Sequence, residues 1–165
     1  MKEKKFLCPS RIVFSVLSLA VMALIFMFSC ENADKSADTS GGITEFVAEH
    51  IVSNFDTRPL SEQQDILSVI DHIVRKSAHF SVFAALGACV SFAAGRRRFF
   101  SVTTLGVIGF CFLYACSDEL HQYFVPGRSC EFGDVLIDSS GAVTGMFFSF
   151  IVMGIMSVIS KKEKK

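Results

Sequence analysis

Two short polar segments carry the side chains of this chain that could do chemistry. The longer one, residues 117–138 (SDELHQYFVPGRSCEFGDVLID), holds five acids, one Arg, one His and one Gln. The shorter one, residues 75–79 (RKSAH), places Lys76 and His79 one helical turn apart. Such cations bind phosphate or carboxylate groups, and imidazole and carboxylate groups can also transfer protons. Whether the chain binds anions or transfers protons depends on the apolar segments, because they position the two polar segments.

Long apolar runs flank both segments and predict a membrane protein. Hydrophobic residues make up 51% of the 165 residues. An α-helix needs about 20 apolar residues to cross a bilayer. Four runs approach that length: about 12–30, 77–94, 99–116 and 139–160. The sequence therefore predicts an all-α, polytopic membrane protein in which residues 1–165 form a single domain, a four-transmembrane-helix bundle.

Charge is segregated along the chain, although the net charge is zero. Eleven of the sixteen basic residues precede the first run, lie at 96–98 or follow the fourth run. Fourteen of the sixteen acids lie in the two other connections, residues 31–76 and 118–138. Cytoplasmic loops of membrane proteins are enriched in Lys and Arg. We therefore expect both termini in the cytoplasm and the two acidic connections outside.

The first run has a competing interpretation. Basic residues followed by an apolar stretch that ends at Cys30 are also typical of a cleaved signal peptide or a lipoprotein signal. However, the run is long enough to span, and Met27 and Phe28 stand where a signal peptidase needs small residues. A retained anchor is therefore expected. The sequence leaves open whether Cys30 and Cys130 pair.

The connection between the first two runs is expected to contain an outer helical segment, residues 43–75. Residues 31–42 (ENADKSADTSGG) are rich in Ser, Asp and Gly and are expected to form a flexible link. After it, apolar residues recur at helical spacing from Ile43 to Phe55. Beyond Pro59 a second apolar pattern continues without a stop signal, so we expect one helix that projects above the membrane and runs into the second span.

The start of the fourth run carries two acids and two glycines along one helical face. Asp134, Asp138, Gly141 and Gly145 recur at spacings of four, three and four residues. Two glycines four residues apart are a weak signal for close helix packing. Together with the acids, the pattern predicts that this face presses on the bundle and points both acids at residues 75–79.

The polar residues of both segments are therefore expected to form one site at the outer end of the bundle. The expected binding residues are Lys76, His79, Asp118, Glu119, Gln122, Arg128, Asp134 and Asp138. Whether the protein is an enzyme stays open. If it is, the candidates for catalysis are His79 as general base or nucleophile and Asp118 or Glu119 as the acid that orients it.

Two sequence segments, one at the start of the second apolar run and one between the third and fourth runs, carry a family resemblance. They are KSAHFSVF, residues 76–83, and SDELHQYFVPGRSCEFGDVLIDSSG, residues 117–141. With the apolar runs around them they resemble the VanZ-like membrane proteins over nearly the whole chain. The resemblance implies a multi-pass protein of the bacterial cytoplasmic membrane, in a family whose founder contributes to resistance to the glycopeptide teicoplanin.

The family pattern carries over onto individual positions of this chain. These are Lys76, His79, Asp118, Glu119, Gln122, Phe124, Arg128, Asp134 and Gly141. Family members commonly have Asn one turn after the position of Asp134, whereas Asp138 and Ser139 stand there in this chain. The family's hydrogen-bond scheme is therefore not expected to transfer in detail.

Three functions remain open from the sequence. In the first, the site binds or modifies an envelope lipid, a cell-wall precursor or a lipoglycopeptide, and the acids hold Lys76 and Arg128 in place when the site is empty. In the second, the protein is a membrane enzyme acting on a lipid-linked phosphate or ester, with Arg128 stabilising the developing anion. In the third, the charges form a structural salt-bridge cluster, and function lies in the outer helices.

No cofactor and no metal ion are expected. A divalent cation held by Asp118, Glu119, Asp134 and Asp138 would suit the preference of such ions for oxygen ligands. However, acids that face Lys and Arg are more often in salt bridges. The expected partners are membrane lipids, with cell-wall precursors or lipoglycopeptides as further partners, and no nucleic acid is expected.

Overall fold

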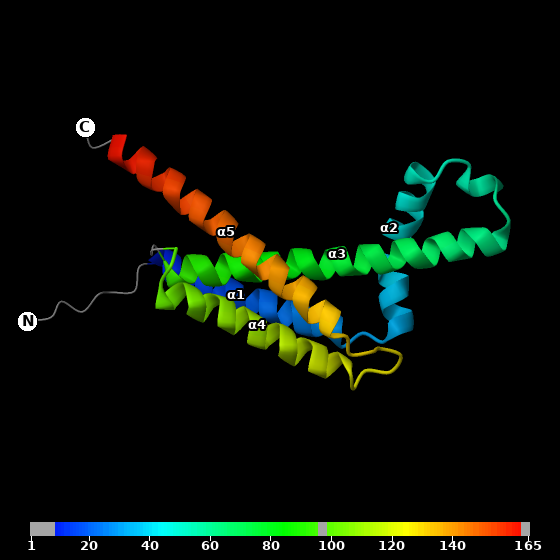
Figure 1. Ribbon diagram of the computed structural model, residues 1–165, viewed down its shortest axis with the longest axis horizontal. Coiled ribbons are helices and arrows are strands. Elements are labelled where there is room, and N and C mark those ends of the chain that lie inside the picture. Colours follow the sequence, from blue (N-terminus) through cyan, green and yellow to red (C-terminus); the bar gives the residue numbers. More distant parts are fainter. Residues whose placement is uncertain (1–8, 96–98, 163–165) are drawn as a thin grey trace, which may run out of the picture.

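The computed structural model describes residues 9–95 and 99–162, and the described chain is helical. The elements are α1 (Pro9–Ser29), α2 (Ala33–Ile51), the short 3-10 helix η1 (Phe55–Thr57), α3 (Leu60–Ala94), α4 (Val102–Gln122) and α5 (Phe132–Lys162) (Figure 1). Four of them, α1, α3, α4 and α5, are long and apolar enough to cross a membrane. The predicted all-α architecture with four spans is confirmed.

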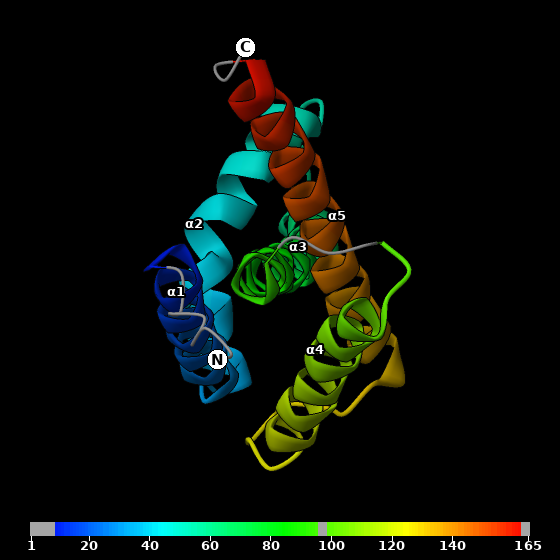
Figure 2. The same ribbon diagram turned by 90° about the vertical axis from the view of Figure 1, so that its left-hand side faces the viewer.

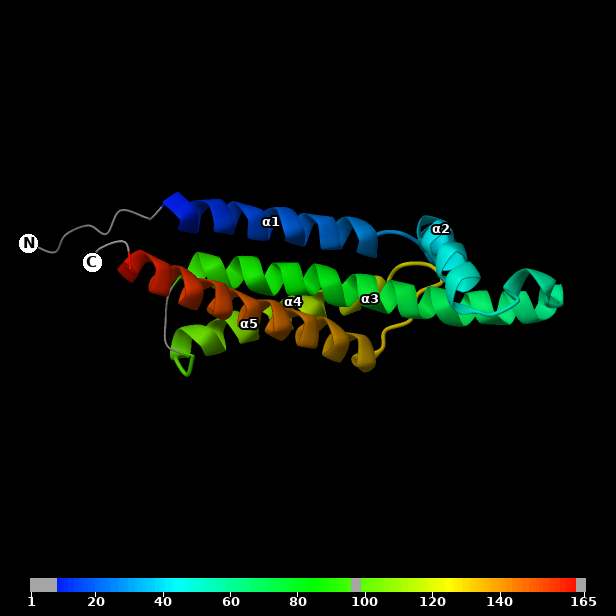
Figure 3. The ribbon, with the colours of Figure 1, turned by 90° about the horizontal axis from the view of Figure 1, so that it is seen from above.

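Helix α3 is the centre of the bundle. It packs against α1, α2, α4 and α5, and the view along the bundle shows it between α1 and α5 (Figure 2). Its 35 residues give a length of about 50 Å, well beyond the ~30 Å of bilayer hydrocarbon. Figure 3 shows the excess as a projection beyond α1, α4 and α5, with α2 beside it. The expected helix that runs from the outer segment into the second span is confirmed.

The expected flexible link at residues 31–42 is wrong, because α2 already begins there. The Asn32 side chain caps this helix by accepting a hydrogen bond of 2.9 Å from the Lys35 main-chain N–H. Further along, the Ser40 hydroxyl donates to the carboxylate of Asp71 on α3. Since a cap contributes about 1 kcal/mol, the cap and the contact with α3 offset the low helix propensity of the paired glycines in this stretch.

Helices α3 and α5 approach closely through glycines. A Cβ atom added at Gly141 would meet the main chain of Phe80, and one added at Gly145 would meet the main chain of Ala84. Gly87 of α3 lies in the same way against the main chain of α5. The predicted close packing of this glycine face is confirmed. It fixes the register in which the polar side chains of the two helices face each other.

The bundle has two distinct ends. At one, here called the terminal end, the Arg11 guanidinium donates to the carbonyl oxygens of Ala93 and Ala94 at 2.9 and 3.2 Å, and both ends of the described chain lie there (Figures 1 and 3). The α1–α2 and α4–α5 connections lie at the other, here called the polar end. The basic residues expected at 2–5 and 96–98 lie outside the described residues.

Candidate functional site

The outermost polar contact between α3 and α5 is a salt bridge. Lys76 Nζ lies 2.5 Å from Asp134 Oδ1 and 3.8 Å from a carboxylate oxygen of Glu131. The side chains of Lys76 and Asp134 are 27% and 31% exposed. We call the Lys76–Asp134 pair the outer contact. It neutralises both charges while leaving them partly in water, so it serves mainly to hold the two helices together.

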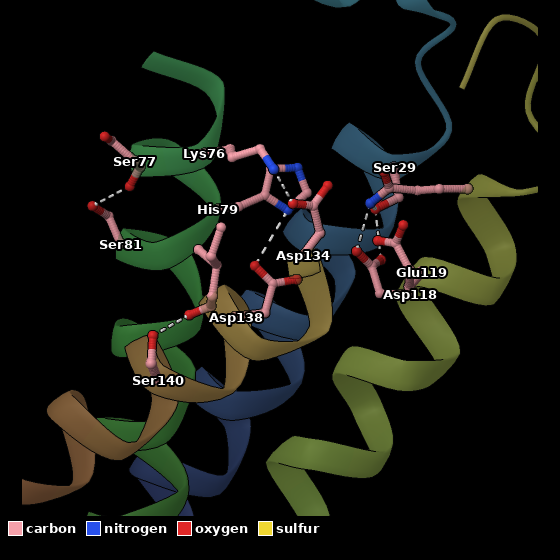
Figure 4. Close-up of polar contacts among 12 residues, drawn as sticks. Ser29, Lys76, Ser77, His79, Ser81, Asp118, Glu119, Asp134, Asp138 and Ser140 are labelled. Atoms are coloured by element: carbon pink, nitrogen blue, oxygen red, sulfur yellow. Dashed lines mark hydrogen bonds and ion pairs between the residues drawn. The ribbon is translucent and has the colours of Figure 1, made fainter. Parts of the chain in front are cut away.

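One turn deeper lies the inner contact, formed by His79 and Asp138 (Figure 4). His79 Nδ1 is 3.6 Å from Asp138 Oδ1, which is too far for a hydrogen bond. Asp138 is only 1% exposed, and neither of its carboxylate oxygens has a hydrogen-bond partner. Because buried polar groups are almost always hydrogen-bonded, this carboxylate is the most unusual group of the cluster.

Asp118 joins α1 to α4. Its Oδ1 accepts a hydrogen bond of 2.6 Å from the Ser29 hydroxyl, and its Oδ2 accepts one of 2.9 Å from Gln122 Nε2. Asp118 and Ser29 are both buried. Sequence reasoning missed Ser29, because a serine at the end of an apolar run is ordinary, and its role depends on how α1 meets α4.

Glu119 has a structural task at the polar end. Its Oε1 accepts a hydrogen bond of 2.7 Å from the main-chain N–H of Glu131, and the residue is 2% exposed. This bond fastens the loop that follows α4 to the start of α5. The loop in turn delivers the remaining cation of the cluster.

Arg128 follows the predicted Pro-Gly turn, where Gly127 adopts a positive φ of 78°. Its Nη1 donates to Gln122 Oε1 at 3.0 Å and its Nε to the main-chain oxygen of Glu31 at 3.2 Å. Among the described residues it forms no ion pair with a carboxylate, although Asp118, Glu31 and Glu119 attract it from a longer distance. The expected direct hold by acids is therefore seen for Lys76 and not for Arg128. Burial lowers the pKa of the Arg128 guanidinium, but an arginine stays protonated in proteins.

Two cavities adjoin at the polar end. One, of about 250 Å³, lies between α1, α2 and α3 and has mostly apolar walls, which include Ile25, Phe28, Ile43, Val74, Val82 and Phe83. The other, of about 220 Å³, is polar and lies between α3, α5 and the loop that contains Gly127. Arg75, His79 and Arg128 line both cavities. A ligand with a charged head and an apolar tail would find complementary surfaces here.

The structure brings all eight predicted side chains to the polar end from α3, α4, α5 and one loop. Phe124, which the resemblance placed in the pattern, is 73% exposed. Arg75 belongs to the polar segment 75–79 but was not among the expected binding residues. It lines both cavities and pairs with Asp71 at 3.0 Å. Cys30 and Cys130 are both free thiols.

Comparison with known proteins settles the family. A family model described as VanZ/LLP1 matches residues 14–153, a range that contains every member of the polar cluster. The chain belongs to the VanZ/LLP1 family. Its four long apolar helices make it a multi-pass membrane protein of this family. Searches of curated proteins and of solved structures give no match.

Proposed function

We propose that this VanZ/LLP1 protein binds the anionic headgroup of an envelope lipid or lipid-linked cell-wall precursor at its polar end. By doing so it would contribute to resistance to teicoplanin-type glycopeptides. The observation that carries the proposal is the position of Arg128, which borders both cavities and has no carboxylate partner among the described residues. A half-buried cation of this kind attracts an anion.

The chemistry of Arg128 suits phosphate or carboxylate. A guanidinium is planar and presents its N–H groups as a fork that binds either anion through two parallel hydrogen bonds. Only neutral acceptors, Gln122 Oε1 and the Glu31 carbonyl, hold the group in place. They orient the fork, while the carboxylates of Asp118, Glu31 and Glu119 act on it only from a distance. Arg75 adds a second guanidinium to the rim of the same cavities.

The apolar cavity supports a lipid as the carrier of that anion. In a bilayer the tail of a lipid is already in an apolar medium, so its entry into the cavity adds little affinity. The affinity therefore comes from the headgroup contact, and the cavity fixes where the first methylenes of the tail lie. This division predicts selectivity for the headgroup and tolerance of the tail.

The proposal places the polar end outside the cell, where precursors and glycopeptides meet. The enrichment of basic residues near both termini supports this orientation. Single cysteines at Ser129 and at Ser101, on a background without native cysteines, test it. We expect an impermeant maleimide to label intact cells at position 129 and not at position 101. Labelling at position 101 alone would show that the topology is the opposite of the one proposed.

Direct binding tests the proposed ligand. The protein in nanodiscs is titrated with lipid II, undecaprenyl phosphate and phosphatidylglycerol, with phosphatidylcholine as the lipid without net charge. We expect the anionic lipids to bind. Arg128→Lys should lower the affinity for them by about 10-fold or more, because hydrogen bonds to charged groups contribute ~1.5–3 kcal/mol. The matched control is Arg11→Lys at the terminal end, which should bind as the wild type does.

The same titrations can refute the proposal. Equal binding of phosphatidylcholine, or anionic binding that Arg128→Lys leaves unchanged, would show that Arg128 is not a headgroup site. Mass spectrometry of the recovered lipids distinguishes binding from turnover. A lipid recovered with its phosphate or ester cleaved would favour a membrane enzyme over a protein that only binds the lipid.

A further inference from the structure

The acids of the polar cluster have unequal partners. Asp134 pairs with Lys76, and Glu119 accepts a hydrogen bond from a main-chain N–H. Asp118 and Asp138 are 4% and 1% exposed, and neither forms an ion pair with a Lys or Arg of the described chain. The nearest side-chain cation to Asp138 is His79, and it can pair with this acid only when its imidazole is protonated. Since buried charges in proteins are paired or coordinate metal ions, a metal ion shared by the two carboxylates would be an alternative partner for both.

Geometry brings an imidazole to the same two carboxylates. One ligand atom each of His79, Asp118 and Asp138 lie within 4.8 Å of one another, and the three residues come from α3, α4 and α5. Two atoms bound to one tetrahedral Zn²⁺ ion lie about 3.3–3.6 Å apart. Side-chain rotations that shorten the longest of these distances by about 1 Å would bring all three atoms into a single coordination sphere.

Independently of this proximity, Asp138 is unsatisfied. Both of its oxygens are buried without a hydrogen bond, and the carboxylate points at His79 across the gap between α5 and α3 (Figure 4). A salt-bridge network built only for rigidity would not leave both oxygens of its most buried acid without a hydrogen bond. A bound cation would satisfy them.

We propose that His79, Asp118 and Asp138 bind one divalent transition-metal ion, such as Mn²⁺ or Zn²⁺. One imidazole nitrogen and two carboxylates are ligands that both ions accept. Ser29 and Gln122 hydrogen-bond to Asp118 and thereby orient its carboxylate, as residues behind metal ligands commonly do. The sequence expectation of no metal is revised on this point.

The site lies beside the polar cavity, which His79 and Asp138 help to line. Three protein ligands leave a coordination position for water or for an oxygen of a bound molecule. The inference goes beyond lipid binding and does not depend on it, because the metal can be measured on the protein alone.

Metal binding is tested on the purified full-length protein in detergent after removal of bound metal with a chelator. Mn²⁺ is titrated and followed by electron paramagnetic resonance, which avoids the cysteines that could capture Zn²⁺, and Zn²⁺ is then added as a competitor. We expect about one Mn²⁺ ion per protein, displaced by Zn²⁺. Bound Mn²⁺ should also raise the thermal unfolding midpoint, since a ligand of the native state stabilises it.

Variants locate the ion. Mutation of a residue that hydrogen-bonds to a metal ligand typically lowers metal affinity by roughly 10–100-fold. Asp138→Asn and His79→Gln remove a ligand itself, so each should lower the affinity for Mn²⁺ by more than this. The matched controls are Asp65→Asn, an exposed acid of α3, and His50→Gln on α2, and both should bind Mn²⁺ as the wild type does. The inference is overturned if the wild type binds neither ion, or if folded Asp138→Asn and His79→Gln bind Mn²⁺ normally.

Discussion

The outer and inner contacts between α3 and α5 use similar residues but differ in burial. Both pairs lie within ion-pair distance. Lys76 and Asp134 are partly exposed and 2.5 Å apart, whereas Asp138, one turn deeper, is almost fully buried and lies 3.6 Å from His79 with no hydrogen bond to either carboxylate oxygen. A salt bridge at the water interface costs little free energy, whereas a buried carboxylate without hydrogen bonds is destabilising. This contrast is the basis of our proposal that the outer contact holds the helices together and the inner contact binds a ligand.

The first prediction breaks both contacts by separating the helices. Gly145→Ala places a methyl group against the main chain of Ala84, and such overpacking costs about 1–3 kcal/mol. We expect a lower thermal unfolding midpoint and a lower yield of folded protein in detergent. Gly154→Ala on the same helix is the control, because no atom lies within 4 Å of the added methyl group. Equal stability of the two variants would mean that α3 and α5 do not pack as described.

The second prediction separates the two contacts. Asp134→Asn removes the ion pair with Lys76 and should lower the free energy of unfolding by about 0.5–1 kcal/mol, as expected for a partly exposed pair that water screens. High salt should reduce this difference. Asp138→Asn in the metal-free protein should leave stability unchanged or raise it, because it removes a buried charge. A larger loss for Asp138→Asn than for Asp134→Asn would reverse the roles assigned to the contacts.

The third prediction concerns the support of the inner contact. Ser29→Ala removes the 2.6 Å hydrogen bond to Asp118, and the expected loss is about 1 kcal/mol or less, since Gln122 still donates to the same carboxylate. Unfolding of this variant beside Ser18→Ala measures the effect, because the Ser18 hydroxyl only donates to the Phe14 carbonyl within α1. If both variants lose the same stability, the Asp118 contact adds nothing specific.

Most of the fold could be predicted because its signals are local. The apolar runs predicted the four spans. The uninterrupted helical spacing of apolar residues beyond Pro59 predicted the projecting helix α3. The link at 31–42 was predicted wrongly because Ser, Asp and Gly favour loops. Its helix depends on the Asn32 cap and on the contact of Ser40 with Asp71, and the second of these joins residues far apart in the chain.

For the candidate site, residue types and topology were enough to predict which side chains come together. Their pairing was not predictable, because it depends on the register between helices. Arg128 was expected beside acids and instead bonds to Gln122 and a main-chain oxygen. Ser29 carried no signal at all, since its hydroxyl matters only where the end of α1 meets Asp118.

The central claim is that the cation at the junction of the two cavities is the working group of this protein. The most direct test is the teicoplanin inhibitory concentration of cells that express the wild type, Arg128→Lys or Arg11→Lys at equal membrane levels. We predict that Arg128→Lys loses the protection given by the wild type, because an ammonium cannot form the planar two-bond contact, and that Arg11→Lys retains it. Full protection by Arg128→Lys at normal protein levels would contradict the account.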